Sequence, residues 1–314
     1  MEKRKQHWER LEALVGRCAN GLSALNHSEL QEIGMLYRQT ASDLSVALQD
    51  PSSRQLAGYL NQLLGRSHNL VYSSQRASAG GIVNFYWRTY PRIFRETFSL
   101  TALGAAIFLV AAIGSWAVTL RDPGFAHRLL GPRMMDTIER REMWTHSVVT
   151  MKPVAASAIT TNNLTVSFTI FALGITVIGP IWMMVLNGML MGVVGAATWQ
   201  AGMAVSLWSF VAPHGSLELP AIFIASGAGL HIARGLLFPG YLPRRASLAQ
   251  AGGQASKLVL GTVPLLLVAG VIEGFFSATD APPAMKFALG GVLFAVLLTY
   301  LFGTSRGAKA DSDL

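Results

Sequence analysis

Charge is the scarcest property of this 314-residue chain. Asp, Glu, Lys and Arg make up 13% of the residues, against about 25% in a typical soluble domain. Between Lys152 and Glu218 there are 65 consecutive residues without any of the four. Because a surface in contact with water carries charged side chains, this composition excludes an ordinary soluble enzyme. The 51% hydrophobic content excludes a disordered chain as well.

Cysteine and the common catalytic motifs are also scarce. Cys18 is the only cysteine, which excludes a disulfide-stabilised secreted scaffold. The sequence contains no G-x-x-x-x-G-K-[ST] loop, no H-E-x-x-H, no C-x-x-C and no G-x-S-x-G. These absences argue against many standard membrane enzymes and pumps. No basic cluster is long enough to follow a phosphate backbone, so we expect no nucleic-acid partner.

Long apolar runs are what the chain has instead. A membrane-spanning helix needs about 20 apolar residues, and the runs predict an all-α, polytopic membrane protein with about six transmembrane helices. The predicted spans are Ser99–Leu120, Leu164–Ile181, Met183–Gly202, Leu217–Phe238, Ser256–Phe276 and Met285–Phe302. Gly179-Pro180 is expected to end or kink the second span. The second and third spans can also be interpreted as a re-entrant hairpin, which leaves the orientation of later spans unchanged.

Residues 1–81 precede the apolar runs and predict a soluble helical hairpin. Ser28 and Gln31 have the spacing of a capping box that opens a helix. Asp50-Pro51 is expected to end that helix and to start the next one. Leucines recur at helical spacing in both segments. We expect a packed cytoplasmic domain or a docking surface for a protein partner. The charged beginning of the chain predicts no cleavable signal peptide.

Residues 82–98 combine aromatic side chains with Arg88, Arg92 and Arg95. Aromatic and basic residues just before an apolar helix are typical of an interfacial segment in contact with membrane lipids. We therefore expect three further regions after the hairpin: this segment, a six-span membrane domain over 99–303 and a cytoplasmic tail over 304–314.

The basic residues predict the orientation of the spans. With a cytoplasmic N-terminus, the six-span arrangement places 18 Lys and Arg residues inside and 7 outside. Cytoplasmic loops usually carry such an excess. We expect a cell inner-membrane protein with both termini in the cytoplasm.

A few ionisable residues fall within or beside the spans. His214 and Glu218 are four residues apart at the start of the fourth span, and Glu273 lies near the end of the fifth. Since these two spans run in opposite directions, the three residues are expected at one depth near the outer surface. Asn162 and Asn163, at the outer start of the second span, fall at that level too.

Such a cluster has several interpretations. It can bind a divalent metal, for which His214, Glu218 and Glu273 are the candidate ligands. It can also act as an acid/base pair, relay protons or line an ion path. Alternatively, the glutamates simply stabilise helix packing. His231, Arg234 and Asn187 are secondary candidates. Arg234 is expected to extend toward cytoplasmic headgroups, and Asn187 to form an interhelical hydrogen bond.

Gly188 and Gly192 form a G-x-x-x-G motif, which permits close contact between helices. The motif is common by chance in a chain with 31 glycines, so it does not decide whether the protein forms a homo-oligomer.

Several segments resemble the stage II sporulation protein M family. They are Ile159-Thr-Thr-Asn-Asn163, Phe171-Ala-Leu-Gly-Ile175, Asn187-Gly188, Pro213-His-Gly-Ser-Leu-Glu-Leu-Pro-Ala-Ile222, Pro239-Gly240 and Ile272-Glu-Gly-Phe-Phe-Ser277. The chain is similar to the longer branch of that family, which has a cytoplasmic helical region before the first span. The resemblance implies a localising or scaffolding membrane subunit whose partners, in the sporulation setting, degrade peptidoglycan. It implies no enzymatic activity. His214, Glu218 and Glu273 fall on motif positions.

These observations favour a non-enzymatic membrane subunit that scaffolds or couples a larger membrane assembly, with envelope remodelling as one setting. The first alternative is a channel or transporter that uses the Glu/His cluster. The second is an intramembrane metal-dependent hydrolase.

Overall fold

The computed structural model describes residues 2–17, 25–49, 53–73, 79–143 and 152–303, and these residues form helices and connecting turns without a β-strand. Six helices are long and apolar enough to cross a membrane. The predicted fold class, an all-α polytopic membrane protein, is confirmed. The chain divides into two compact units, Met1–Val83 and Asn84–Leu314. The predicted tail over 304–314 lies outside the described residues.

The described residues of the first unit form three long helices, where the sequence predicted a two-helix hairpin. They are α1 (Glu2–Arg17), α2 (His27–Ala47) and α3 (Arg54–Ser73). The prediction missed α1 because charged residues dominate its sequence and leave only a narrow apolar stripe. That stripe includes Leu11 and Leu14, which are fully buried together with Leu60 and Leu63 of α3. The third helix therefore completes a small hydrophobic core.

The N-cap of α2 lies two residues before the predicted Ser28. Asn26 is the N-cap: its Oδ1 accepts a hydrogen bond from the Glu29 backbone N–H at 2.8 Å. The Glu29 carboxylate in turn accepts from the Asn26 N–H at 3.0 Å. Ser28 only donates its hydroxyl to Asn26 Oδ1. Asparagine with Glu at the third helical position forms a complete capping box. The predicted junction at Asp50-Pro51 lies outside the described residues.

Polar contacts attach α1 to the other two helices. Arg10 donates two hydrogen bonds to the Glu32 carboxylate of α2, both of 2.9 Å. Glu12 accepts hydrogen bonds from Arg66 and Tyr59 of α3. The hydrogen bond from Arg66, followed by that from Tyr59, holds the pKa of Glu12 below its usual value of 4.5. Exposed ion pairs add little stability each, so these contacts mainly select the face that α1 presents to the core.

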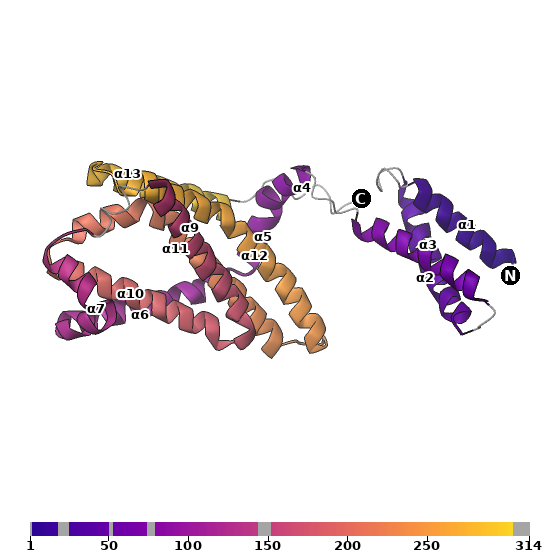
Figure 1. The fold of residues 1–314 in the computed structure, drawn as a ribbon, viewed down its shortest axis with the longest axis horizontal. Coiled ribbons are helices and arrows are strands. Elements are labelled where there is room, and N and C mark those ends of the chain that lie inside the picture. The colour runs from indigo at the N-terminus through magenta and orange to yellow at the C-terminus, as the bar shows by residue number, and fades with distance from the viewer. Residues whose placement is uncertain (1, 18–24, 50–52, 74–78, 144–151, 304–314) are drawn as a thin grey trace. The chain divides into compact units, whose positions relative to one another are not determined.

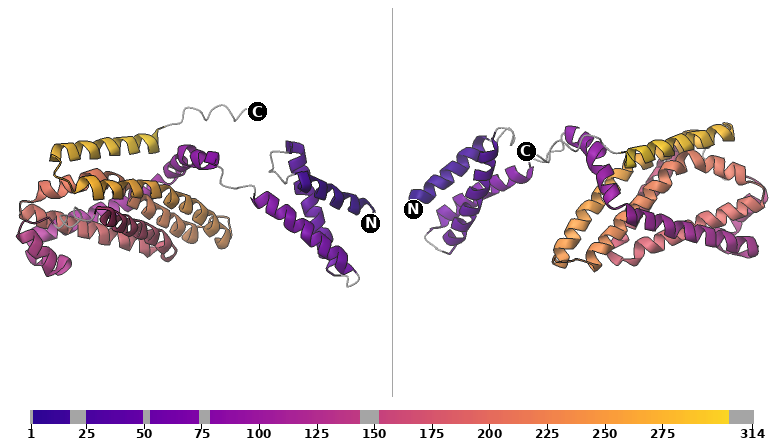
Figure 2. Two further views of the ribbon diagram at one scale, coloured as in Figure 1. Left: turned by 45° about the horizontal axis from the view of Figure 1, so that its top comes forward. Right: turned by 180° about the vertical axis from the view of Figure 1, so that it is seen from behind.

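The short helix α4 (Ala79–Asn84) ends at the boundary between the two units. The second unit begins with two short segments, the π-helical turn η4 (Phe85–Thr89) and α5 (Tyr90–Glu96), and continues into the long helices (Figures 1 and 2). The rest are α6 (Phe98–Arg121), α7 (Pro123–Glu139), α9 (Lys152–Ala172), the 3₁₀ turn η5 (Leu173–Thr176), α10 (Ile178–Gln200), α11 (Ala204–Leu237), α12 (Arg244–Ile272), the π-helical turn η6 (Glu273–Ser277) and α13 (Pro283–Phe302).

Three of the long helices start well before their predicted spans. The second begins at Lys152 instead of Leu164. The fourth begins at Ala204 instead of Leu217, and the fifth at Arg244 instead of Ser256. Hydropathy locates only the apolar part of a helix, whereas the helix itself continues as long as its backbone hydrogen bonds do. Pro213 and Pro220 lie inside α11 without ending it, because neighbouring helices stabilise a proline-containing transmembrane helix.

The chain breaks between α9 and α10 at Val177, two residues before the predicted Gly179-Pro180. Val177 has a positive φ of 66°, which ends the 3₁₀ turn η5. Gly179 and Pro180 instead lie in the first turn of α10. Proline is tolerated there because the first N–H groups of a helix have no partner within the helix.

The G-x-x-x-G motif is used inside the chain, where α10 packs against α6 (Figure 1). A Cβ atom on Gly188 would overlap the Phe108 carbonyl oxygen, and one on Gly192 would overlap that of Ala112. Ser115 of α6 also donates a 3.0 Å hydrogen bond to the Met189 carbonyl of α10. The two backbones are therefore in direct contact, as small residues permit in membranes.

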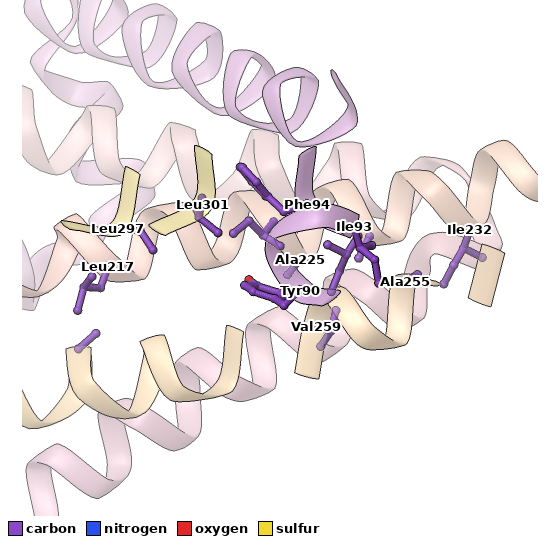
Figure 3. Packing of buried hydrophobic residues seen from close by; sticks show 14 residues of the cluster. Tyr90, Ile93, Phe94, Leu217, Ala225, Ile232, Ala255, Val259, Leu297 and Leu301 are labelled. Carbon is purple, nitrogen blue, oxygen red and sulfur yellow. The ribbon is translucent and has the colours of Figure 1, made fainter. Parts of the chain in front are cut away.

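The aromatic segment before α6 is partly buried in the bundle. Tyr90, Ile93 and Phe94 of α5 belong to a core cluster with residues of α11, α12 and α13 (Figure 3). The Tyr90 ring occupies the space where Gly261 would carry a Cβ atom. Trp87, on the other hand, is 74% exposed. The segment predicted to be interfacial thus has one face inside the protein and another outside it.

Three hydrogen bonds hold this segment in place. In one of them the Tyr300 hydroxyl of α13 donates to the Tyr86 carbonyl at 2.6 Å. The Tyr86 hydroxyl donates to the Leu260 carbonyl at 3.4 Å, which lacks its usual helical partner because Pro264 has no N–H. Arg95 donates to the Leu301 carbonyl at 2.8 Å, near the end of α13. Arg95 therefore stabilises the last turn of α13.

Candidate functional site

His214 and Glu218 are both provided by α11. Their spacing of four residues places them on the same face of the helix, as the sequence predicted. The helix starts ten residues before His214, so both residues lie inside the bundle instead of at the beginning of a span.

Glu273 and Ser277 come from η6, the π-helical turn that follows α12. Because α12 runs opposite to α11, its end lies beside the first half of α11 (Figure 1). Single π-helical turns inside longer helices are frequent at functional sites. In this protein the turn directs both Glu273 and Ser277 toward His214.

The three ionisable side chains form one cluster. One potential ligand atom from each of His214, Glu218 and Glu273 lies within 4.8 Å of the other two. His214 Nε2 is 3.8 Å from a Glu273 carboxylate oxygen. On the other side of the ring, Nδ1 is 3.0 Å from the Ser277 hydroxyl. The His214 residue is 6% exposed, so this geometry is held by its surroundings.

Asn162 and Asn163 of α9 form the wall opposite to the cluster. Together with Ala158 and Ile159 they enclose a cleft of about 390 Å³ that is also lined by His214, Glu218 and Glu273. The Asn163 amide donates toward the Glu218 carboxylate. The five principal candidates thus surround a single cleft between α9, α11 and η6.

One carboxylate oxygen in this cleft has an unusual environment. Glu218 Oε2 is completely buried and has no hydrogen-bond partner among the described residues. A buried carboxylate oxygen without a partner is costly, and such an atom therefore indicates a site for a ligand or a proton.

Lys286 is a buried residue of this region that was not among the predicted site residues. It is 7% exposed, and its amino group donates to the carbonyls of Ser277 and Thr279 at 2.8 and 2.7 Å. These bonds hold the end of η6, where Ser277 contacts His214. The available signal was its position as the one charged residue of the last span, since an isolated cation in a span usually has a specific role.

The secondary candidates do not join the cluster. Asn187 donates to the Met183 carbonyl of its own helix at 2.8 Å, so the predicted interhelical hydrogen bond is wrong. The methionine carbonyl one turn earlier was simply the nearer acceptor. His231 pairs with Gln254 of α12 at 2.9 Å, and it shares a separate cleft with Arg234. Arg234 is exposed, and its predicted contact with headgroups stays a prediction.

The arrangement is suited to a limited set of tasks. A histidine nitrogen and two carboxylates can bind a divalent cation. The same groups can hold and transfer a proton, because two carboxylates in close contact cannot both carry full charge in a buried site. The Ser277 and Asn163 contacts orient the ring and one carboxylate, as outer contacts do in many metal and proton sites.

The comparisons with known proteins match two parts of the chain. A family model described as stage II sporulation protein M matches residues 102–278, which is more than half of the sequence. The chain belongs to the stage II sporulation protein M family. A second model, described as a domain of unknown function (DUF8413), matches residues 1–73. Searches of curated proteins and of solved structures found no match.

The family assignment confirms the resemblance that the sequence segments indicated. The matched region contains the whole cluster, since Asn162 is its first member and Glu273 its last. The separate match over residues 1–73 fits the longer branch of the stage II sporulation protein M family. Lys286 lies beyond the matched residues.

Proposed function

We propose that this member of the stage II sporulation protein M family is a non-enzymatic subunit that couples a larger membrane assembly, with envelope remodelling as its setting. In this proposal, the N-terminal unit binds a protein partner and the helical bundle anchors that partner at the membrane. The observation that carries the proposal is the division of the chain into two separately packed units.

The N-terminal unit has the features of a binding module. Its three helices bury their own core, in which Leu11, Leu14 and Leu60 have no exposed surface. Its surface displays Met35 and Val46, which are 53% and 57% exposed. These two residues are eleven positions apart on α2 and therefore lie on the same side of the helix. Exposed apolar residues on a charged surface support a docking role.

Removal of residues 1–80 should abolish capture of the partner without affecting membrane insertion. The measurement is crosslinking in native membranes, followed by purification of the tagged chain and identification of the bound proteins by mass spectrometry. The double variant Met35→Asp, Val46→Asp should reduce the recovered partner at least about tenfold, because central apolar contacts dominate most interfaces.

Gln62→Asp serves as the matched control, since Gln62 is an exposed polar residue on a different helix, α3. It should leave capture unchanged. If the chain without residues 1–80 recovers the same proteins as the full chain, the coupling proposal is wrong.

We also propose the membrane orientation, with both termini on the cytoplasmic side of the inner membrane. The excess of basic residues in the loops assigned to the cytoplasm supports it. Trp116 and Trp199 lie at the opposite end of the spans, where their rings are 6.3 Å apart, and tryptophan is enriched at membrane interfaces.

Single-cysteine variants can test this orientation because Cys18 is the only native cysteine. In a Cys18→Ser background, Asp280→Cys should react with an impermeant maleimide added outside spheroplasts. Tyr241→Cys, in the fully exposed turn between α11 and α12, should react only after permeabilisation. The reverse labelling pattern would contradict the proposal.

A further inference from the structure

The cluster of His214, Glu218 and Glu273 offers a mixed nitrogen and oxygen donor set. Bonds of about 2.0–2.2 Å from a metal to each ligand place neighbouring ligand atoms about 3–4 Å apart. The 3.8 Å separation between His214 Nε2 and Glu273 already falls in this range. The remaining atoms lie within 4.8 Å, so a small side-chain rotation brings all three onto one ion.

The charge of the cluster favours a cation. Two carboxylates share a cleft inside the bundle, and Glu218 Oε2 has no partner among the described residues. Lys286 does not compensate them, since its described hydrogen bonds go to the backbone carbonyls of Ser277 and Thr279. A divalent cation would neutralise both carboxylates and give the orphan oxygen a partner.

The histidine is oriented for metal binding. The contact between Nδ1 and the Ser277 hydroxyl leaves Nε2 directed toward Glu273. A metal-binding histidine commonly uses its other ring nitrogen for such an outer hydrogen bond. Lys286 holds the Ser277 carbonyl in turn, so the ring is supported by a second layer of fixed groups.

The chemistry of the donors narrows the choice of cation. Imidazole suits first-row transition metals and zinc, whereas magnesium and calcium prefer sites made entirely of oxygen ligands. The described residues that line the cleft include no cysteine. Three protein ligands beside a cleft of about 390 Å³ leave a coordination position for water or for an asparagine oxygen.

We propose that His214 Nε2, Glu218 and Glu273 form a binding site for one first-row divalent cation, with Zn²⁺ as the best match. The site is positioned by Ser277 and Asn163. It does not depend on the coupling function, because a cation can bind whether or not the N-terminal unit captures a partner.

The test uses the full chain, purified in detergent, with its affinity tag removed and treated with a chelator. Equilibrium dialysis against Zn²⁺, with metal content measured by mass spectrometry, should show saturable binding of one ion per chain. Millimolar Mg²⁺ should not compete. His214→Ala and Glu273→Gln should each weaken binding at least tenfold. Ser277→Ala should weaken it by about tenfold, as expected for an outer-layer contact.

The matched control is His231→Ala. His231 lies on the same helix but pairs with Gln254 in a separate cleft, so this variant should bind Zn²⁺ like the wild type. Size-exclusion profiles establish that each variant is folded, and Glu218→Gln preserves the shape of the side chain. Co²⁺ provides a second readout, because its visible absorption reports histidine and carboxylate coordination directly.

Absence of saturable Zn²⁺ binding by the folded wild-type chain would overturn the proposal and would leave the cluster as a proton or packing site. Equal binding by wild type and by folded Glu218→Gln or His214→Ala would overturn it too, since the bound ion would then be elsewhere. Loss of binding in His231→Ala to the same extent would have the same consequence.

Discussion

Replacing Gly192 by leucine is expected to destabilise the membrane bundle by about 3 kcal/mol or more, a cost at the upper end of that for overpacking a core. The new Cβ atom would overlap the Ala112 carbonyl oxygen and the Ser115 hydroxyl of α6. A backbone carbonyl cannot rotate away as a flexible side chain can, so α6 and α10 would have to separate. The temperature at which half of the protein loses its monodisperse size-exclusion peak should fall by roughly 6–12 °C.

Gly114→Leu is the control for this substitution. Gly114 is a glycine of α6 where a Cβ atom would meet nothing within 4 Å, and we expect a shift close to zero. Equal destabilisation by both substitutions would show that close packing against α6 does not explain the effect, since leucine has a higher helix propensity than glycine. A change of oligomeric state in Gly192→Leu without loss of stability would instead assign the motif to contact between copies of the chain.

Replacing Lys286 by methionine is expected to cost about 2–5 kcal/mol. Methionine has a similar length but donates no hydrogen bond, so the buried carbonyls of Ser277 and Thr279 would lose their partner. An unsatisfied buried group costs about 1–3 kcal/mol, and more when the lost bond was to a charged group. Thermal unfolding in detergent measures the loss.

Lys257→Met is the matched control, because Lys257 is an exposed lysine of α12. It should unfold at the wild-type temperature. If Lys286→Met is equally stable, the lysine does not hold the end of η6. If it is unstable but retains wild-type Zn²⁺ affinity, the support that we assign to Lys286 beneath His214 is wrong.

Much of the candidate site could be predicted from the sequence. The four-residue spacing of His214 and Glu218 follows from helical periodicity, and the antiparallel direction of two consecutive spans places Glu273 at the same end. Both follow from the geometry of a single helix and from the fact that consecutive membrane spans run in opposite directions. They require no knowledge of how the helices pack.

The supporting residues could not be predicted in the same way. Lys286 is the second residue of the last apolar run, and only the packing of α13 shows that it is buried. Asn187 and the aromatic segment around Tyr90 were assigned partners by residue type. Which atoms they contact depends on distances between helices, which hydropathy does not contain.

The first unit shows the same limitation. The stripes of α2 and α3 are broad enough to predict two helices, whereas α1 is predominantly charged. The narrow apolar stripe around Leu11 does not by itself predict a helix. The structure shows that it is buried against the core formed by the other two helices.

The sequence by itself determined the membrane class, the approximate positions of six spans, the family and the residues of the polar cluster, because composition and helical periodicity are properties of the chain. The tertiary structure alone decided that a third helix completes the N-terminal unit, that Gly188 and Gly192 pack against α6, and that Ser277 and Lys286 support His214. These features depend on contacts between residues far apart in the chain, where backbone shape and hydrogen-bond geometry decide which partners meet.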